Sequence, residues 1–438
     1  MFTKIDQKST WPRGKGLGGS SLLNSMQYMR GNPKDYDEWS ELGASGWSYK
    51  EVLPYFMKSE RYHESDDIDE NFHGKNGPMG VRKLPKYSCK MSKLLEDSLN
   101  DTLGIPKGDC NAKNQNVIYQ SQFNQNSGKR ADSYSCFAAP FVGKGLTILT
   151  YAHASRILMS GVTAKGVEVD RFGQKFEFFA KREVIISAGS IGSPQLLMLS
   201  GNYFYKFYDI FFKSHYMNLT GLALTYKNIL IYLGIGPKRH LDDVGLKTLV
   251  DRPGVGSNLQ DHIMILMDGL TNSNEWLGFD PLWNIDPMKY LTWLLKNPYN
   301  GPLGDSGIGT GAFIHTPFEN KDPFNRPQIQ LFTIPLYLSV CHVNARRILG
   351  ISDKSLELQR EHKGKDGVSI LPALLRPKST GTIRLASTNH HDHPLIDPQY
   401  LKHPDDVKTL VEALKIVKNI YDSKHFRYDF SITKDTKY

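Results

Sequence analysis

The glycine cluster at residues 14–21, GKGLGGSS, limits the folds open to this chain. Gly14, Gly16 and Gly19 satisfy the pattern G-x-G-x-x-G, which in a dinucleotide-binding unit follows a buried strand and opens a helix. Only thirteen residues precede Gly14, and charged and polar residues interrupt them. No buried parallel strand is expected there, so the cluster does not fit the first phosphate-binding turn of a Rossmann fold.

The segment after the cluster is rich in apolar residues. Residues 22–31 read LLNSMQYMRG, with Ser20 and Ser21 before them and Asn32 and Pro33 after them. Serine at the start and glycine and proline at the end predict a short helix. Such a helix start presents backbone N–H groups to a phosphate or an electron-rich ring edge, and a plain helix cap is the alternative interpretation.

A run of strands is predicted from residue 146 onward. Residues 146–159, 165–172 and 175–180, with a turn at Gly173, indicate an antiparallel meander. The apolar run 184–189, VIISAG, predicts a strand buried on both faces. Ser193 at the N-cap and Pro194 at the first helical position predict a helix over QLLMLSG. Strand, glycine turn and helix together are the local geometry of a dinucleotide site.

Later segments predict a second sheet and a closing helix. Strands are expected at residues 327–332, 368–377 and 381–387. A helix is expected to begin at Pro404, and its apolar positions of helical period predict the face that packs on the core: Val407, Leu410, Val411, Leu414, Val417 and Tyr421. Residues 63–82 are acidic, glycine-rich and contain histidine, which predicts an exposed excursion between elements.

Length and charge exclude several classes of protein. A chain of 438 residues is long enough for two or three domains with sizeable cores. Its net charge of +9 comes from scattered Lys and Arg, which favours a solvated surface over a nucleic-acid partner. No run of 18 apolar residues predicts a membrane span. The four cysteines show no C-x-x-C spacing, so neither a zinc site nor a disulfide framework is predicted.

The histidine-rich tetrad HHDH at residues 390–393 is a second candidate for chemistry. Two histidines flanking an aspartate can bind zinc. The tetrad lies between two predicted strands, next to Pro394, and the sequence shows no second cluster of ligands beside it. A solvated loop is therefore favoured, and no metal site is predicted.

Both glycine segments taken together resemble the signatures of the glucose–methanol–choline (GMC) oxidoreductases. The first signature matches without departure, and the second matches up to Ser200–Gly201. The matching residues are Gly14–Ser21, Leu23, Asn24, Tyr28, Gly31 and Asp37 in the first, and Gly189–Pro194 in the second. Residues 254–262, 374–385 and 394–401 also resemble family segments. The likeness points most to insect members of the glucose dehydrogenase type.

This resemblance implies an α/β fold. It combines an incomplete, discontinuous FAD-binding Rossmann-like domain (residues 1–60 and 130–265) with an α+β substrate domain on an antiparallel sheet (residues 61–129 and 266–438). The residues placed at FAD-contacting positions are Gly18, Gly19, Ser20, Asn24, Ser25, Gln27 and, on the adenine side, Ala154. The implied activity is oxidation of CH–OH groups of alcohols or sugars, with hydride passing to flavin and then to a quinone or oxygen. The relatives also suggest an extracellular location.

The resemblance assigns no catalytic residue within these 438 residues. The family's catalytic histidine corresponds to a position beyond the helix that ends at Tyr421, and His262, His390, His391 and His393 do not match it. Together with the lack of a strand before Gly14, this predicts no turnover by the chain as written. Two alternatives stay open: a catalytically inert fragment with a structural or binding role, and, less favoured, an NAD-dependent dehydrogenase.

One stretch departs from the second signature. Ser200-Gly201 and Ile235-Gly236 should be contiguous, but 33 residues, 202–234, separate them, and ten of these are Tyr or Phe. The codons of Gly201-Asn202 can contain a splice donor and those of Leu233-Gly234 an acceptor. Removing the bases between them restores Ser-Gly-Ile-Gly in frame. We therefore interpret the stretch as a retained intron, with an aromatic-rich functional insertion as the alternative. Genomic sequence without GT and AG at those codons would exclude the intron.

Overall fold

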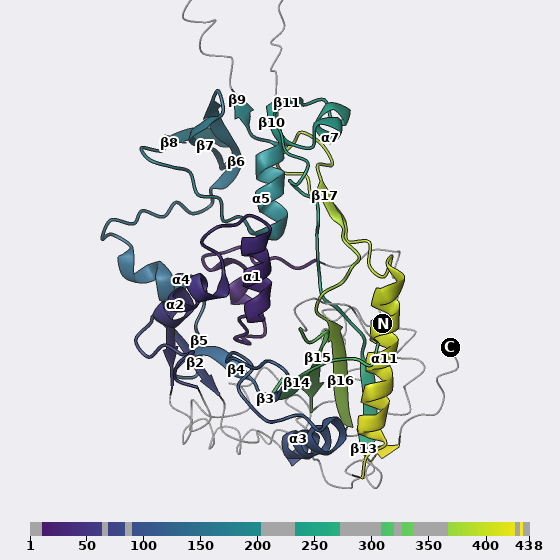
Figure 1. Cartoon of the computed structure of the whole chain (residues 1–438). Helices are drawn as coiled ribbons and strands as arrows, with labels where there is room; N and C mark the ends of the chain where they lie inside the picture. The colour runs from purple at the N-terminus through teal and green to yellow at the C-terminus, as the bar shows by residue number, and fades with distance from the viewer. Residues whose placement is uncertain are drawn as a thin grey trace, which may run out of the picture. The chain divides into compact units, whose positions relative to one another are not determined.

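The chain forms two compact units, each assembled from separate stretches of sequence. The computed structural model describes residues 11–63, 69–83, 90–202, 233–271, 308–318, 326–335, 367–424 and 430–431 (Figure 1). Unit 1 comprises Met1–Leu146, His262–Arg376 and Pro404–Tyr438, and unit 2 comprises Thr147–Asp261 and Pro377–His403. The domain limits expected from the sequence divide the chain into an FAD-binding and a substrate-binding domain, which is a different division from that into compact units. Those limits remain a prediction.

Unit 1 is built on a seven-stranded sheet in which every pair of neighbours is antiparallel. This confirms the expected antiparallel sheet and the mixed α and β class. The path of the sheet is β19-β13-β16-β15-β14-β3, and β12 also pairs with β16. Its strands are β3 (Ile118–Gln120), β12 (Ile263–Met264), β13 (Met267–Thr271), β14 (Thr310–Ile314), β15 (Ile329–Ile334), β16 (Gly367–Leu374) and β19 (Phe430–Ser431). Consecutive residues of β14 and β16 are buried, so both faces of the central strands are covered.

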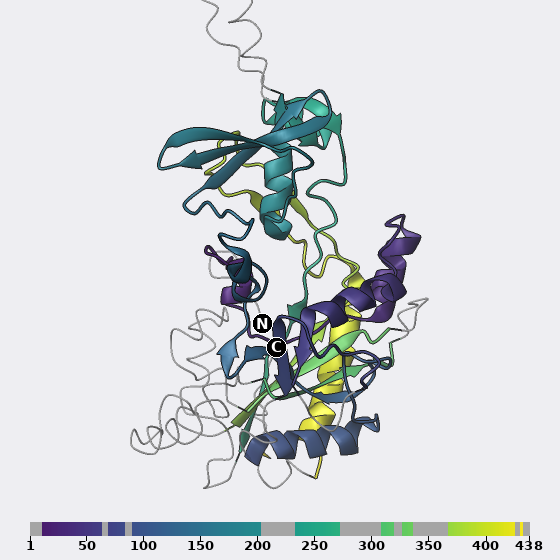
Figure 2. The ribbon, with the colours of Figure 1, turned by 90° about the vertical axis from the view of Figure 1, so that its left-hand side faces the viewer.

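Helix α11 (Pro404–Tyr421) packs on this sheet, where it contacts β16 and β13 (Figures 1 and 2). The helix is confirmed, but its buried face differs from the expected stripe. Val407 and Val411 are each 42% exposed, while Ala413 and Ile420 are fully buried. The apolar face contains more positions than the sheet can cover, and the contacts with the sheet decide which of them are buried. The Tyr421 hydroxyl donates to the Met267 carbonyl over 2.9 Å.

A smaller four-stranded sheet also lies in unit 1, and helix α3 (Lys90–Leu103) packs beside α11. The strands are β1 (Glu60–Tyr62), β2 (Met79–Lys83), β4 (Gln122–Asn126) and β5 (Lys129–Arg130), and the flanking helices are α1 (Pro33–Glu41), α2 (Tyr49–Ser59), α4 (Ser133–Phe137) and η2 (Ala139–Phe141). The expected exposed excursion at residues 63–82 is only partly right: residues 63, 69–71, 75, 76 and 78 are exposed, but the rest of the described segment is not. Strand β2 pairs with β1 and β4, and Val81 and His73 are buried.

Unit 2 contains the expected meander, formed by β6 (His153–Ser160), β7 (Thr163–Arg171) and β8 (Gln174–Phe179). The turn at Gly173 is also confirmed, with φ at +78°, a conformation that favours glycine. The remaining elements are α5 (Gly189–Met198), β9 (Gly201–Asn202), β10 (Leu233–Gly236), α7 (Lys238–Asp243), β11 (Lys247–Asp251), β17 (Thr382–Arg384) and β18 (Leu395–Asp397). The core of the unit is the cluster Met198, Leu199, Leu241, Leu246 and Leu385.

Three expectations for unit 2 are wrong. Residues 184–188 form no strand, and Ile185 is 78% exposed, because no strand in the described part of the chain pairs with them. Helix α5 begins at Gly189 rather than after Ser193, and Pro194 lies inside it, which removes one backbone hydrogen bond without ending the helix. The strand expected at 381–387 is the shorter β17, which pairs with β18 and belongs to no larger sheet.

The insertion at residues 202–234 is described only at its ends, and residues 203–232 lie outside the described part. Its ends meet: a Cβ built on Gly201 would lie 2.3 Å from the Leu233 Cβ. A side chain at Gly201 therefore has no room, and the backbone leaves and re-enters unit 2 at the same place. Among the described helices, none is both long enough and apolar enough to cross a membrane.

Candidate functional site

The glycine–serine loop of unit 1 is a tight turn followed by one turn of 3-10 helix, η1 (Gly19–Leu22). The Gly19 N–H donates to the Gly16 carbonyl over 2.9 Å, and the Gly14 N–H donates to the Ser20 hydroxyl over 3.2 Å. A Cβ on Gly14 would lie 2.1 Å from the Gly19 carbonyl oxygen. Glycine is therefore required at position 14 for the loop to fold back on itself. The expectation of no strand before Gly14 falls mainly on residues 1–10, outside the described part.

The short helix expected over residues 22–31 is wrong, because the chain leaves η1 in an extended conformation. Met26 has φ at +61°, which ends any helical run, and its carbonyl accepts from the Asn124 N–H over 2.7 Å. Gln27 then forms a bridge with Phe123, and its amide donates to the Ser121 hydroxyl over 3.0 Å. Pairing with β4 overrides the local helical signal, and the turn residues 31–33 begin α1 instead of ending a helix.

The N-terminus of helix α4 is hydrogen-bonded to the loop. Gly18 has φ at +107°, and its carbonyl accepts from the Ser133 hydroxyl over 3.0 Å. The Ser133 N–H donates to the Ser21 hydroxyl oxygen, also over 3.0 Å. Asp132 caps α4 by accepting from the Tyr134 N–H, and a Cβ on Gly18 would lie 2.9 Å from its carboxylate. Gly18 is thus required both by its backbone angle and by the closeness of this cap.

Asn24 is held with its amide donor facing outward. Its Oδ1 accepts from Arg130 Nη1 over 2.7 Å and from the Met26 N–H over 3.1 Å. Two donors on one atom identify that atom as the oxygen, so Nδ2 is the opposite end of the amide. Within the described part of the chain, Nδ2 has no hydrogen-bond acceptor, and Asn24 is exposed. The orientation of the side chain is therefore fixed through its oxygen, and its N–H groups are left available as donors.

The loop surface suits a large cofactor with both apolar and polar parts. Ser20, Asn24 and Ser25 are exposed and Gln27 is half-buried. Leu22 and Leu23 are exposed beside them. A flavin has a planar apolar ring system and a polar ribityl and phosphate chain, so these side chains fit its chemistry. Six of the seven expected cofactor residues lie on this loop, while the seventh, Ala154, is exposed on β6 of unit 2.

A buried network of charged groups anchors the chain directly after the loop. Arg30 Nη2 lies 2.7 Å from Glu60 Oε2, and His73 Nδ1 lies 2.8 Å from Glu60 Oε1. His73 Nε2 lies 2.6 Å from Asp109 Oδ2. Glu60 is fully buried and His73 is 3% exposed. Both ring nitrogens of His73 face a carboxylate, so the doubly protonated imidazolium satisfies the two acids.

Amide side chains join this network to the loop segment. Asn111 Oδ1 accepts from the Arg30 N–H over 2.9 Å, and Asn111 Nδ2 donates to the Tyr28 carbonyl over 2.9 Å. Gln122 Nε2 donates to Asp109 Oδ1 over 2.8 Å, and the backbone carbonyl of Gln122 accepts from the Tyr28 N–H. The network therefore fixes residues 28–30, and through them the course of residues 24–27.

The network predicts a specific pH dependence of stability. Burial lowers the pKa of His73, but its bonds to Asp109 and Glu60 outweigh burial and leave that pKa raised. Burial raises the pKa of Asp109, but His73 outweighs it and the pKa is lowered. The His73 contribution is thus full below the unfolded value of about 6.5 and is lost as pH rises through the folded pKa. The Asp109 contribution is full above about 3.9 and is lost as pH falls through its folded pKa.

We therefore expect the difference in unfolding free energy between the native chain and a His73→Gln variant to be largest between about pH 4 and 6.5. The difference should shrink toward pH 9. Urea unfolding midpoints measured from pH 5 to 9 test this. A difference that is constant over that range would contradict the assignment of a protonated His73.

Two models of one protein family match this chain. The N-terminal family model of the GMC oxidoreductases matches residues 1–203, and the C-terminal model of the same family matches residues 377–437. This chain belongs to the GMC oxidoreductase family. FAD is the cofactor of this family, and its members are oxidoreductases.

Individual GMC relatives support the assignment over nearly the whole chain. Glucose dehydrogenase [FAD, quinone] of Drosophila melanogaster is 32% identical over 95% of this chain and 58% of its own length. Alcohol dehydrogenase [acceptor] of Pseudomonas putida is 30% identical over 95% of this chain and 66% of its own. Formate oxidase of Aspergillus oryzae shares the fold, with a TM-score of 0.77 at 22% identity, covering 99% of this chain and 72% of that one. This chain therefore spans 58% of the length of the glucose dehydrogenase.

Within this GMC chain, the residues that support the loop were not found from the sequence. Arg130 carries no sequence signal, because its contacts with Asn24 arise from strand pairing more than a hundred positions away. Asp132 followed by Ser133 does carry a signal, since Asp is a favoured N-cap. His73 lies in a segment whose composition predicts exposure, and only the pairing of β2 explains its burial.

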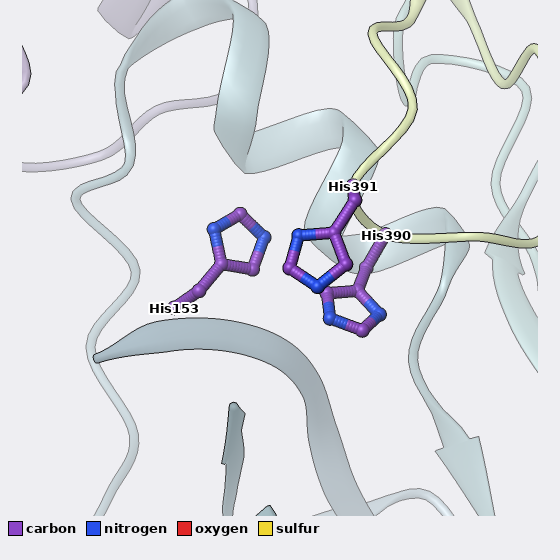
Figure 3. A group of neighbouring side chains, drawn as sticks. All are labelled: His153, His390 and His391. Atoms are coloured by element: carbon purple, nitrogen blue, oxygen red, sulfur yellow. The ribbon is translucent and has the colours of Figure 1, made fainter. Parts of the chain in front are cut away.

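The HHDH tetrad of this GMC chain lies between β17 and β18, as expected, and His391 and His393 are exposed. The structure adds a third histidine that the sequence did not connect with the tetrad. His153, at the start of β6, lies beside His390 and His391 (Figure 3). The sequence predicts no metal site because His153 is far from the tetrad along the chain.

Proposed function

We propose that this chain is part of an FAD-dependent oxidoreductase that oxidises CH–OH groups of alcohols or sugars. The observation that carries the proposal is the Gly14–Gln27 loop, whose exposed polar groups are held in place by α4, β4 and Arg130. The names of two relatives, glucose dehydrogenase and alcohol dehydrogenase, support the substrate class. When bound, FAD would accept a hydride from the carbon that bears the hydroxyl group.

The residues of this chain would bind and orient the cofactor. Gly18 and Gly19 keep the turn free of side chains, and Ser20, Asn24, Ser25 and Gln27 offer hydroxyl and amide groups. Leu22 and Leu23 would cover apolar ring surface and exclude water from it. Ala154 in unit 2 is proposed for the adenine side. These roles come from the family positions and from the exposure of each side chain.

Asn24→Ala should weaken FAD binding by about tenfold, because one oriented hydrogen bond contributes about 1–1.5 kcal/mol. Titration of the purified chain with FAD, followed by flavin fluorescence or absorbance near 450 nm, measures this. Asn71→Ala is a matched control, since Asn71 is exposed in the same unit and its side chain donates to Asp69 Oδ1 over 2.8 Å, away from the glycine–serine loop in sequence. Equal loss of affinity in both variants would exclude a specific role for Asn24.

A panel of substrates tests the reaction itself. The chain with FAD is mixed with glucose, a primary alcohol or choline, and bleaching of the flavin is followed before a quinone or oxygen is added. Bleaching by an alcohol or sugar supports the proposed reaction, and the second addition identifies the electron acceptor. FAD binding without bleaching would favour a binding role and agree with the expectation of no turnover. Binding of NAD instead of FAD would overturn the proposal.

A further inference from the structure

Three histidine side chains converge at one edge of unit 2. His153 comes from β6, while His390 and His391 come from the loop between β17 and β18 (Figure 3). The ring centroids of His390 and His391 are 4.0 Å apart, and that of His153 lies 5.2 Å and 5.3 Å from them. One nitrogen of each ring lies within 4.8 Å of the others. Three imidazole side chains thus lie close together.

A carboxylate lies beside two of these histidines. Asp170 on β7 is the direct cross-strand partner of His153, so both side chains lie on the same face of the meander. Asp170 Oδ2 is 3.1 Å from His391 Nε2 and 3.5 Å from His390 Nε2. Two strands and one loop therefore place three imidazole side chains together, and the Asp170 carboxylate lies against His390 and His391.

The loop that carries two of these histidines is ordered by its own hydrogen bonds. The Asp392 carboxylate accepts from the Ser387 hydroxyl over 2.5 Å and from Asn389 Nδ2 over 3.0 Å. The His391 N–H donates to Asn389 Oδ1, and Gln195 Nε2 donates to the Asp392 carbonyl over 2.9 Å. Asp392 is thus engaged within the loop, and Asp170 is the carboxylate that faces the histidines.

One ring nitrogen of the three histidines lacks a hydrogen-bond partner among the described residues. His390 Nε2 is buried and has no hydrogen-bond partner among the described residues, since 3.5 Å from Asp170 is longer than an N–H···O bond. A buried polar atom without a partner destabilises the fold. A cation bound between the rings would use the lone pair of this nitrogen and those of the other two.

We propose that His153, His390 and His391 bind a divalent transition-metal ion, with Asp170 as the oxygen ligand. Imidazole nitrogen with one carboxylate oxygen is a ligand set of tetrahedral zinc, whereas magnesium and calcium prefer oxygen alone. Nitrogens bound to one zinc ion lie about 3.4 Å apart, given Zn–N bonds of about 2.1 Å. The observed separations reach up to 4.8 Å, so binding would require the exposed His153 and His391 side chains to move toward the ion.

The test is metal binding by the purified full-length chain after treatment with EDTA. Zinc chloride is titrated in competition with a chromophoric chelator, and magnesium chloride serves as the control ion. We expect one zinc ion per chain at this site, no competition by magnesium, and affinity at least about tenfold lower in His153→Ala and in His391→Ala. His393→Ala is the matched control, because His393 lies in the same loop, is exposed and is outside the cluster.

Two further readouts keep the result decisive. Asp170→Asn retains all three imidazoles and should weaken binding, while circular dichroism checks that each variant is folded. Cobalt(II) bound to the native chain should show the intense visible bands of tetrahedral coordination, and these should be lost in His153→Ala. Zinc affinity that is unchanged in His153→Ala, or reduced equally in His393→Ala, would overturn the proposal. So would the absence of zinc binding at millimolar metal.

Discussion

Replacing His73 by leucine lowers the free energy of unfolding of unit 1 by about 3–5 kcal/mol. The substitution leaves the buried carboxylates of Glu60 and Asp109 facing an apolar side chain. Arg30 still compensates Glu60, but Asp109 then loses the only cationic group that the network gives it. Urea unfolding, followed by the fluorescence of the aromatic residues of unit 1, measures the loss as a lower midpoint.

The size of this effect follows from the environment of the network. Moving an ion from water into a protein interior is unfavourable by several kcal/mol, and only close partners offset this. His73 provides such partners at 2.8 Å and 2.6 Å. Because the same bonds fix Tyr28 and Arg30 through Asn111, the variant should also loosen the loop before them. Weaker FAD binding should therefore accompany the lower stability.

A matched control separates the effect of removing a buried histidine from the effect of removing any histidine. His63 is exposed and lies only ten positions earlier, so His63→Leu should change the unfolding free energy by less than about 0.5 kcal/mol. His73→Gln keeps a hydrogen-bond donor, so its loss of unfolding free energy should lie between those of His73→Leu and His63→Leu. Equal midpoints for His73→Leu and His63→Leu would show that the buried network contributes nothing to stability.

The sequence predicts those elements whose partners are close along the chain. The meander β6–β8 and the turn at Gly173 are confirmed. Each strand of the meander pairs with the next strand in the sequence, so the local alternation of residues is enough to predict it. Helix α11 is likewise confirmed, although the face it buries is set by β16, which lies earlier in the chain. Local pattern gives the type of element, and packing decides its orientation.

Elements that depend on distant partners could not be predicted. Residues 22–31 carry helix signals, yet Gln27 pairs with Phe123, almost a hundred positions away. Residues 184–188 carry a strand signal that requires neighbours on both sides, and the described residues provide none. For the candidate site, the glycine signature identified the loop, while the support from Arg130 and the position of His153 depend on tertiary structure.

Deleting residues 202–234 should raise the free energy of unfolding of unit 2 by up to about 3 kcal/mol. The deletion rejoins Ser200-Gly201 to Ile235-Gly236, and the two ends already meet at Gly201 and Leu233. Holding both ends of a 33-residue loop together requires closure entropy of about (3/2)RT ln n, which is about 3 kcal/mol. Removing the loop removes that penalty, and thermal unfolding of the deleted chain measures the gain.

The core of unit 2 is expected to survive this deletion. Met198 and Leu241, which meet beside Gly234, lie outside the deleted residues. Only Leu233 and Gly234 are lost from β10, while Ile235 and Gly236 retain their pairing with Val250 and Asp251 of β11. The cooperative transition of the unit should therefore persist at a higher midpoint.

A linker variant separates loop length from loop composition. Replacing residues 202–234 by 33 residues of Gly and Ser keeps the closure entropy, so its midpoint should match that of the native chain. Both variants remove ten Tyr and Phe residues and should increase soluble yield, because fewer aromatic side chains are available for association. A lower midpoint in both variants would show that residues 202–234 themselves stabilise unit 2, which favours a functional insertion over a retained intron.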